Sequence, residues 1–95
     1  MEDGKIYALN RSPNCVFAYC ERGGYATSFY IGVTSTGSVY CSSIGCIRGM
    51  ATNDPSTLAN QEQRERFFNK LKDAGFHYNE ENKAVFQNGI KLKIA

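Results

Sequence analysis

Four cysteines are the most reactive side chains in this sequence, and they occur as two pairs with equal spacing. Cys15 and Cys20 are five positions apart, and so are Cys41 and Cys46. Zinc is the first hypothesis for such a pattern, because thiolates bind zinc tetrahedrally. On an extended strand, however, residues five positions apart point to opposite faces. We therefore expect no metal site here and no other cofactor.

The expected strand register also argues against disulfide bonds. If the turns at 21–24 and 34–37 close tightly, Cys20 pairs with Tyr25 and Val33 pairs with Ser38. Two cysteines then flank one tyrosine in each of two rows, Cys15–Tyr30–Cys41 and Cys20–Tyr25–Cys46. Their separation of roughly 9–10 Å exceeds the limit of about 7 Å between Cα atoms in a disulfide. Four free thiols are predicted, with a disulfide framework as the alternative for a secreted chain.

His77 is the only histidine and the only side chain that offers a neutral-pH base. It alternates with Phe76 and Tyr78 on a short expected strand, so we expect it to point outward. Cys20 or Cys46 with His77 forms a nucleophile and base pair in formal terms. No helix start or basic neighbour is evident that would lower a thiol pKa. We therefore expect a protein that is not an enzyme, and we assign no catalytic residue.

The first half of the chain is rich in β-branched and aromatic residues that are punctuated by turn residues. Strands are expected over Lys5–Leu9, Cys15–Cys20, Tyr25–Val33 and Ser38–Cys41, the last running on toward Cys46. Met50–Ser56 is expected to be a linker. A helix should follow near residues 60–74, because Asn60 and Gln63 have capping-box spacing and Gly75 can end it. Asp54-Pro55 or Ser56 could start this helix a turn or more earlier.

Two turn signals organise the remainder of the chain. Residues 79–82 separate the expected strands Phe76–Tyr78 and Lys83–Phe86, and Asn88-Gly89 is a strong hairpin signal before Ile90–Ile94. The sequence thus predicts one small α+β domain over residues 1–95. In this domain a mostly antiparallel β-meander packs on one helix in the C-terminal half, and a C-terminal β-hairpin follows.

The expected register sorts the side chains onto two faces, provided that Tyr25–Val33 has a neighbour on each side. The face toward Phe67, Phe68 and Leu71 of the helix should hold Val16, Ala18, Cys20, Tyr25, Phe29, Ile31, Val33, Tyr40 and Ile44. The other face should hold Phe17, Tyr19, Ala26, Ser28, Tyr30, Val39 and Cys41. This second face is too apolar for ordinary solvation, so we expect it to be covered.

Several elements or partners could cover the aromatic face. The first strand, the C-terminal hairpin or a second copy of the chain would bury its rings within a monomer or a homodimer. Alternatively, the rings stack on the bases of a single-stranded nucleic acid. The residues proposed for this interaction surface are Phe17, Tyr19, Tyr30, Arg22 and Arg48, with the two arginines meeting phosphates in the nucleic-acid hypothesis.

Charge and hydropathy narrow the classes of partner. The 95 residues include 11 basic and 9 acidic side chains, a net charge of +2 that excludes nucleic-acid binding through bulk charge alone. Arg64, Lys70 and Lys72, with Arg22, Arg48 and Lys91, are interleaved with acids and favour a mixed solvated surface. No run approaches the roughly 18–20 apolar residues of a membrane span. We expect a soluble cytoplasmic protein with no membrane partner.

The segment over about residues 58–92 resembles one that recurs in small proteins of bacteriophages and mobile elements. In those proteins a capped helix with a Phe-x2-Leu pattern is followed by glycine, two spaced aromatic residues, an acidic turn and a strand. The matching positions here are Phe68, Leu71, Gly75, Phe76, Tyr78 and Asn79, with Lys83 after the turn. Tyr78 stands where such segments often carry tryptophan. The resemblance implies a phage or mobile-element product that binds a host or phage macromolecule.

From these observations we expect a small interaction or regulatory protein without enzymatic activity. Its partner is a host or phage protein, or a second copy of the chain, bound through the aromatic sheet face. A single-stranded nucleic-acid-binding module is the alternative, and a thiol-dependent enzyme is the third hypothesis.

Overall fold

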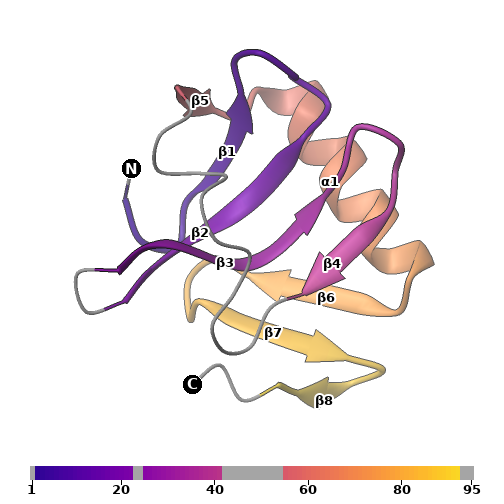
Figure 1. Cartoon of the computed structure of the whole chain (residues 1–95). Coiled ribbons are helices and arrows are strands. Elements are labelled where there is room, and N and C mark those ends of the chain that lie inside the picture. The colour runs from indigo at the N-terminus through magenta and orange to yellow at the C-terminus, as the bar shows by residue number, and fades with distance from the viewer. Residues whose placement is uncertain (1, 23–24, 42–54, 93–95) are drawn as a thin grey trace.

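The computed structural model describes residues 2–22, 25–41 and 55–92, and for residues 20–22 and 25–30 it describes the backbone alone. It confirms the predicted α+β class, with antiparallel strands in two sheets and a helix packed on the larger sheet (Figure 1). Ile44, Cys46 and Arg48 lie outside the described residues, so the predictions made for them stay predictions.

The larger sheet of the described chain has five strands in the order β4-β3-β2-β1-β5, and every neighbouring pair is antiparallel. β3 therefore has a neighbour on each side, as predicted. The strands are β1 Ile6–Leu9, β2 Val16–Arg22, β3 Tyr25–Val33, β4 Val39–Cys41 and β5 Ser56–Leu58. A second sheet has the order β6-β7-β8, formed by Phe76–Asn79, Ala84–Gln87 and Ile90–Lys91.

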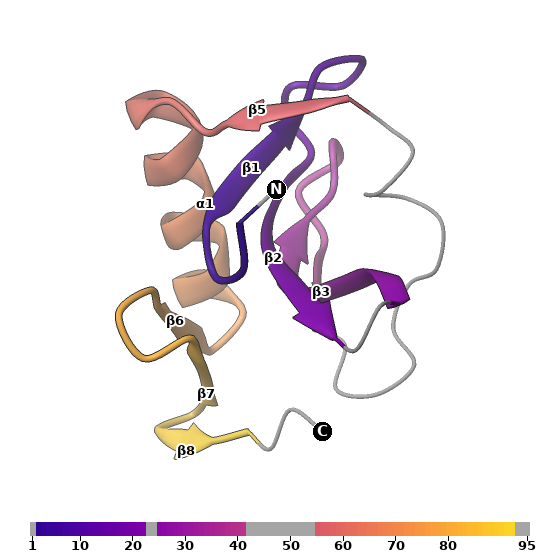
Figure 2. The same cartoon turned by 90° about the vertical axis from the view of Figure 1, so that its left-hand side faces the viewer.

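The helix α1, Gln61–Asp73, and the smaller sheet lie on the same side of the larger sheet (Figure 2). α1 contacts β2 and β3, β6 contacts α1, and β7 contacts β3. Between these layers lies the main core, which includes Val16, Ala18, Ile31 and Val33 from the sheet, as predicted. The other buried members are Ile6, Ala8, Phe67, Leu71, Tyr78 and Val85. Burial of apolar area between these layers stabilises their arrangement.

β4 has the opposite facing from the one predicted. The sequence suggests that Val33 pairs with Ser38, whereas Val33 pairs with Val39. A shift of one residue moves every side chain of a strand to the other face. Val39 and Cys41 therefore pack against the main core, and Tyr40 lies on the far side of the sheet.

The hairpin of β2 and β3 is longer than predicted. β2 continues to Arg22, which pairs with Tyr25, whereas the sequence suggested Cys20 as the partner of Tyr25. Register shifts between Ala18 and Tyr19 and between Cys20 and Arg22 then place Cys20 opposite Ser28. Such bulges bend a strand and depend on the twist of the whole sheet, which local spacing does not encode.

The described thiols agree with the prediction of free cysteines. Neither Cys15 nor Cys41 forms a disulfide bond with another described residue, and each is partly buried. Cys15 packs with the aromatic cluster on the far face, and Cys41 packs with the main core on the helix side. They therefore lie on opposite faces of the sheet. The prediction that both share one face in a row with Tyr30 is wrong. The side chains of Cys20 and Cys46 lie outside the described part of the chain.

β5 begins at Ser56, the last residue of the expected linker, and runs to Leu58, where no strand was expected. Its residues pair with β1, with Leu9 opposite Ser56 and Tyr7 opposite Leu58. Three residues are too few to show an alternating pattern, so no strand signal is visible in this part of the sequence. β5 closes one edge of the larger sheet, and Leu58 remains 59% exposed there.

The predicted helix caps are confirmed. The Asn60 side chain accepts a hydrogen bond from the Gln63 backbone N–H at 2.8 Å, and the Gln63 side chain accepts one from the Asn60 N–H at 2.9 Å. Gly75 follows the helix with φ +84°, a conformation that glycine adopts at little cost. In the described ranges, no helix combines the length and the apolar character needed to cross a membrane.

Two contacts attach the C-terminal strands to the start of the chain. The buried Tyr78 hydroxyl donates to the Gly4 carbonyl at 2.6 Å, and the Lys83 ammonium lies 3.0 Å from an Asp3 carboxylate oxygen. Gly4 has φ +84°, and a Cβ there would come within 2.8 Å of the Lys83 side chain. The turn before β1 thus fixes the position of the β6-β7 hairpin.

Candidate functional site

Two of the rings predicted to form an interaction surface are buried inside the protein. Phe17 is 1% exposed and Tyr19 is 6% exposed. The pairing of β1 with β2 places Tyr7 beside Phe17 at 6.2 Å between ring centroids, and Leu9 joins the same cluster. The prediction that Phe17 and Tyr19 form an exposed contact surface is therefore wrong. The first strand, one of the covers considered from the sequence, contributes to their burial.

The other predicted surface residues are not tested. The backbones of Arg22 and Tyr30 lie in β2 and β3, but their side chains lie outside the described part of the chain, as does all of Arg48. The cluster around Phe17 also includes the half-buried Tyr40, whose pKa is raised well above its ordinary value by burial and, secondarily, by the Cys15 thiol. Its phenol is therefore harder to deprotonate than that of an exposed tyrosine.

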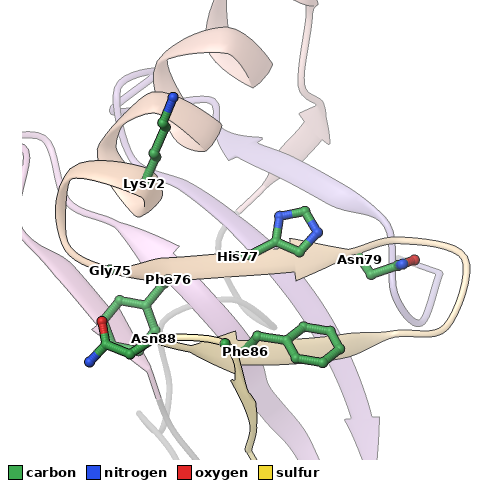
Figure 3. A pocket seen from close by; sticks show the side chains of 8 residues that line it. Lys72, Gly75, Phe76, His77, Asn79, Phe86 and Asn88 are labelled. Carbon is green, nitrogen blue, oxygen red and sulfur yellow. The ribbon is translucent and has the colours of Figure 1, made fainter.

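An open pocket of about 530 Å³ lies where α1 meets the smaller sheet (Figure 3). It is formed by the last turn of the helix and by β6, β7 and the turn that follows β7. Most of its lining surface is apolar, and its polar members are Lys72, His77 and two asparagines. The lining residues are Lys72, Gly75, Phe76, His77, Asn79, Phe86, Asn88 and Gly89.

The strand pairing places an imidazole, a phenyl ring and an ammonium group in one row beside this pocket. His77 is paired with Phe86, and Phe86 is paired with Lys91. Directly paired residues share a face, so these three side chains lie on the outer face of the smaller sheet. The rings of His77 and Phe86 are 6.1 Å apart and inclined at 32°. His77 is exposed, as predicted, and Phe86 is half-buried.

We call this surface the C-terminal face, and define it by His77, Phe86, Lys91 and the pocket residue Lys72. Figure 3 shows the two rings on neighbouring strands and Lys72 at the last turn of α1. The face has a well-defined frame, because the Asn88 backbone N–H donates to the Gly75 carbonyl at 2.8 Å. A Cβ at Gly75 would come within 2.7 Å of the Asn88 side-chain oxygen, so this close approach requires glycine.

The two lysines of the C-terminal face have no acidic ion-pair partner among the described residues. None of the described residues that line the pocket is a carboxylate. Arg64 forms an ion pair with Glu80, and Lys83 forms one with Asp3. By contrast, no ion pair joins Lys72 or Lys91 to any other described residue. The face therefore favours a partner that offers both a flat apolar group and negative charge.

Two other depressions are less suited to binding a charged or aromatic group. One, of about 410 Å³, lies between β1, β5 and the start of α1, and its lining includes no charged side chain. The other includes Arg66, but that guanidinium already donates to the carbonyls of Asn14 and Thr34 and so holds two turns against the helix. We therefore take the C-terminal face as the candidate site.

In residues 2–22, 25–41 and 55–92, no group of three or more histidine, cysteine or acidic side chains is arranged to hold a metal ion. Among the described residues, none forms a hydrogen bond with the His77 imidazole, so none is placed as a nucleophile that it could activate or as a carboxylate that orients it.

Sequence reasoning assigned His77 an outward direction but did not place Phe86 and Lys91 beside it. The signal was present in the turns. Residues 80–83 close the first hairpin and Asn88-Gly89 closes the second, with both Asn88 and Gly89 at positive φ. These turn lengths set the register, and the register puts the three side chains in one row.

Comparisons with protein-family models, with curated proteins and with solved structures gave no match.

Proposed function

We propose that this protein is a small binding protein without enzymatic activity and that it contacts a macromolecule through the C-terminal face. One observation carries the proposal: the exposed His77 and the half-buried Phe86 form a ring pair beside an open pocket, flanked by Lys72 and Lys91. Aromatic side chains that are exposed together commonly mark contacts with other molecules.

This proposal keeps the class of function expected from the sequence and changes the surface. The face that bears Phe17 and Tyr19 is buried, whereas the C-terminal face lies within the segment that resembles phage and mobile-element proteins. A role for the protein in binding a host or phage macromolecule is accordingly part of the proposal. The thiol hypothesis depends on Cys20 and Cys46, and no observation favours it.

Capture of partners on the immobilised protein tests the proposal. We expect a component of a cell lysate to be retained by the wild-type protein and lost with His77→Ala combined with Phe86→Leu. The matched control is Leu58→Ser, which alters an exposed apolar side chain on β5. Retention that is equal for the double variant and the control contradicts the proposal. Sedimentation of the purified protein over a range of concentrations identifies a second copy as the partner.

A further inference from the structure

We infer that the partner of the C-terminal face is a single-stranded nucleic acid, with bases stacked on His77 and Phe86 and phosphates held by Lys72 and Lys91. This inference rests on the proposed function, because it names the partner of the same surface.

The ring pair fits unpaired bases. The rings belong to adjacent strands of a sheet, with 6.1 Å between their centroids and an inclination of 32°, so they form a nearly continuous aromatic surface. Every base has a π-face that can stack on such a surface, and sheets that present aromatic side chains bind single strands in this way. In a duplex the faces of the bases are already stacked on each other, so they are not accessible to these rings.

The charges fit a phosphate backbone. Lys91 on β8 is the cross-strand neighbour of Phe86, and Lys72 lines the same pocket as His77, so both cations belong to the surface that carries the rings. Neither lysine has an ion-pair partner among the described residues, whereas Arg64 and Lys83 are paired with acids. A strand that stacks on the rings meets positive charge without having to break an existing pair.

Two amides add hydrogen-bonding capacity. Asn79 and Asn88 line the same pocket. The Asn79 side-chain oxygen already accepts a hydrogen bond from the Asn82 N–H at 3.1 Å, so Asn79 offers its amide NH2 group, whereas the Asn88 side chain carries both a donor and an acceptor that can meet the edge of a base. A protein contact surface of this size would more commonly have apolar residues around the rings than lysines and amides. With a net charge of only +2, binding must depend on stacking as much as on charge.

Fluorescence anisotropy of a labelled single-stranded oligonucleotide of about eight residues, as DNA and as RNA, tests the inference. We expect Phe86→Leu, which keeps apolar volume and removes the ring, to weaken binding about tenfold. Lys72→Gln combined with Lys91→Gln should lower the slope of log K against log salt by about 1.4, which corresponds to two phosphate contacts. Lys70→Gln, on the exposed surface of α1, is the control and should reduce the slope by less.

Because Phe86 is half-buried, a urea denaturation curve checks that the Phe86→Leu variant is still folded. The Lys72/Lys91 double variant and its Lys70 control change exposed side chains, so they test the inference without altering the core. Equal affinity for a duplex of the same sequence, or equal effects of the Lys70 and Lys72/Lys91 changes, overturns the inference. Absence of oligonucleotide binding, with a protein still retained through His77 and Phe86, overturns the inference and leaves the proposed function standing. Absence of any partner overturns both.

Discussion

At the scale of single residues, a glycine on the larger sheet makes room for the ring of Tyr40 on the far face of that sheet. Gly32 pairs with Tyr40, and a Cβ at Gly32 would overlap the Tyr40 ring. The ring therefore lies directly over the β3 backbone, partly removed from water. This contact explains the raised pKa of Tyr40, since burial disfavours the charged phenolate.

The first prediction concerns Tyr40 in alkaline solution. Below about pH 10 the phenol is protonated in both states, so it adds no pH dependence. Above that pH the unfolded chain loses the proton while the folded protein keeps it, so stability falls as pH rises. We expect the free energy of unfolding to fall by about 1 kcal/mol more in the wild type than in Tyr40→Phe between roughly pH 9 and pH 11. Urea denaturation at both pH values measures this difference, and equal losses in the two proteins contradict the prediction.

At the scale of elements, the helix is the part of the fold that the sequence specifies most directly. Asn60, Gln63 and Gly75 act within a few residues of one another, so their roles can be predicted without knowledge of the tertiary structure. The same holds for the Asn88-Gly89 turn. Local signals of this kind predicted α1 and the C-terminal hairpins correctly.

The second prediction tests the N-terminal cap of α1. Asn60→Ala removes the side-chain acceptor of the Gln63 N–H and should destabilise the protein by about 1 kcal/mol. Asn69→Ala, at an exposed position within α1, is the matched control and should be neutral or slightly stabilising, because alanine favours helix. Urea midpoints measure both effects, and equal midpoints for the two variants contradict the assigned cap.

Elements that depend on distant partners were predicted less well. β5 has only three residues, and its pairing with β1 joins positions 47 residues apart, as in the hydrogen bond from Thr57 to Asn10. The facing of β4 depends on a difference of one residue in its register with β3. The pattern of apolar residues was compatible with both registers, so it did not decide which side of the sheet Tyr40 would occupy.

At the scale of the whole molecule, the candidate site lies where three parts of the chain meet. The end of α1 supplies Lys72, the hairpin supplies His77 and Phe86, and β8 supplies Lys91. Each residue is visible in the sequence, but the surface exists only after the smaller sheet has docked on the helix and on β3. Sequence reasoning chose the larger sheet instead, because apolar density alone does not reveal which rings the fold buries.

The third prediction tests the attachment of the smaller sheet. Tyr78→Phe removes a buried hydrogen bond to the Gly4 carbonyl and should cost about 1–2 kcal/mol. Lys83→Gln removes the exposed pair with Asp3 and should cost less, about 0.5 kcal/mol or below. Urea denaturation gives both values, and amide exchange in β6 and β7 shows whether the hairpin loosens. A larger cost for Lys83→Gln contradicts this ranking.

The bond between Tyr78 and Gly4 joins residues 74 positions apart, and the pair of Lys83 with Asp3 spans 80 positions. During synthesis on the ribosome, the turn at Gly4 must therefore wait until the β6-β7 hairpin has left the exit tunnel before it finds these partners. Closure of such a long loop is entropically costly and slow. We expect nascent chains halted before residue 78 to remain sensitive to protease and to become resistant only after the hairpin has emerged.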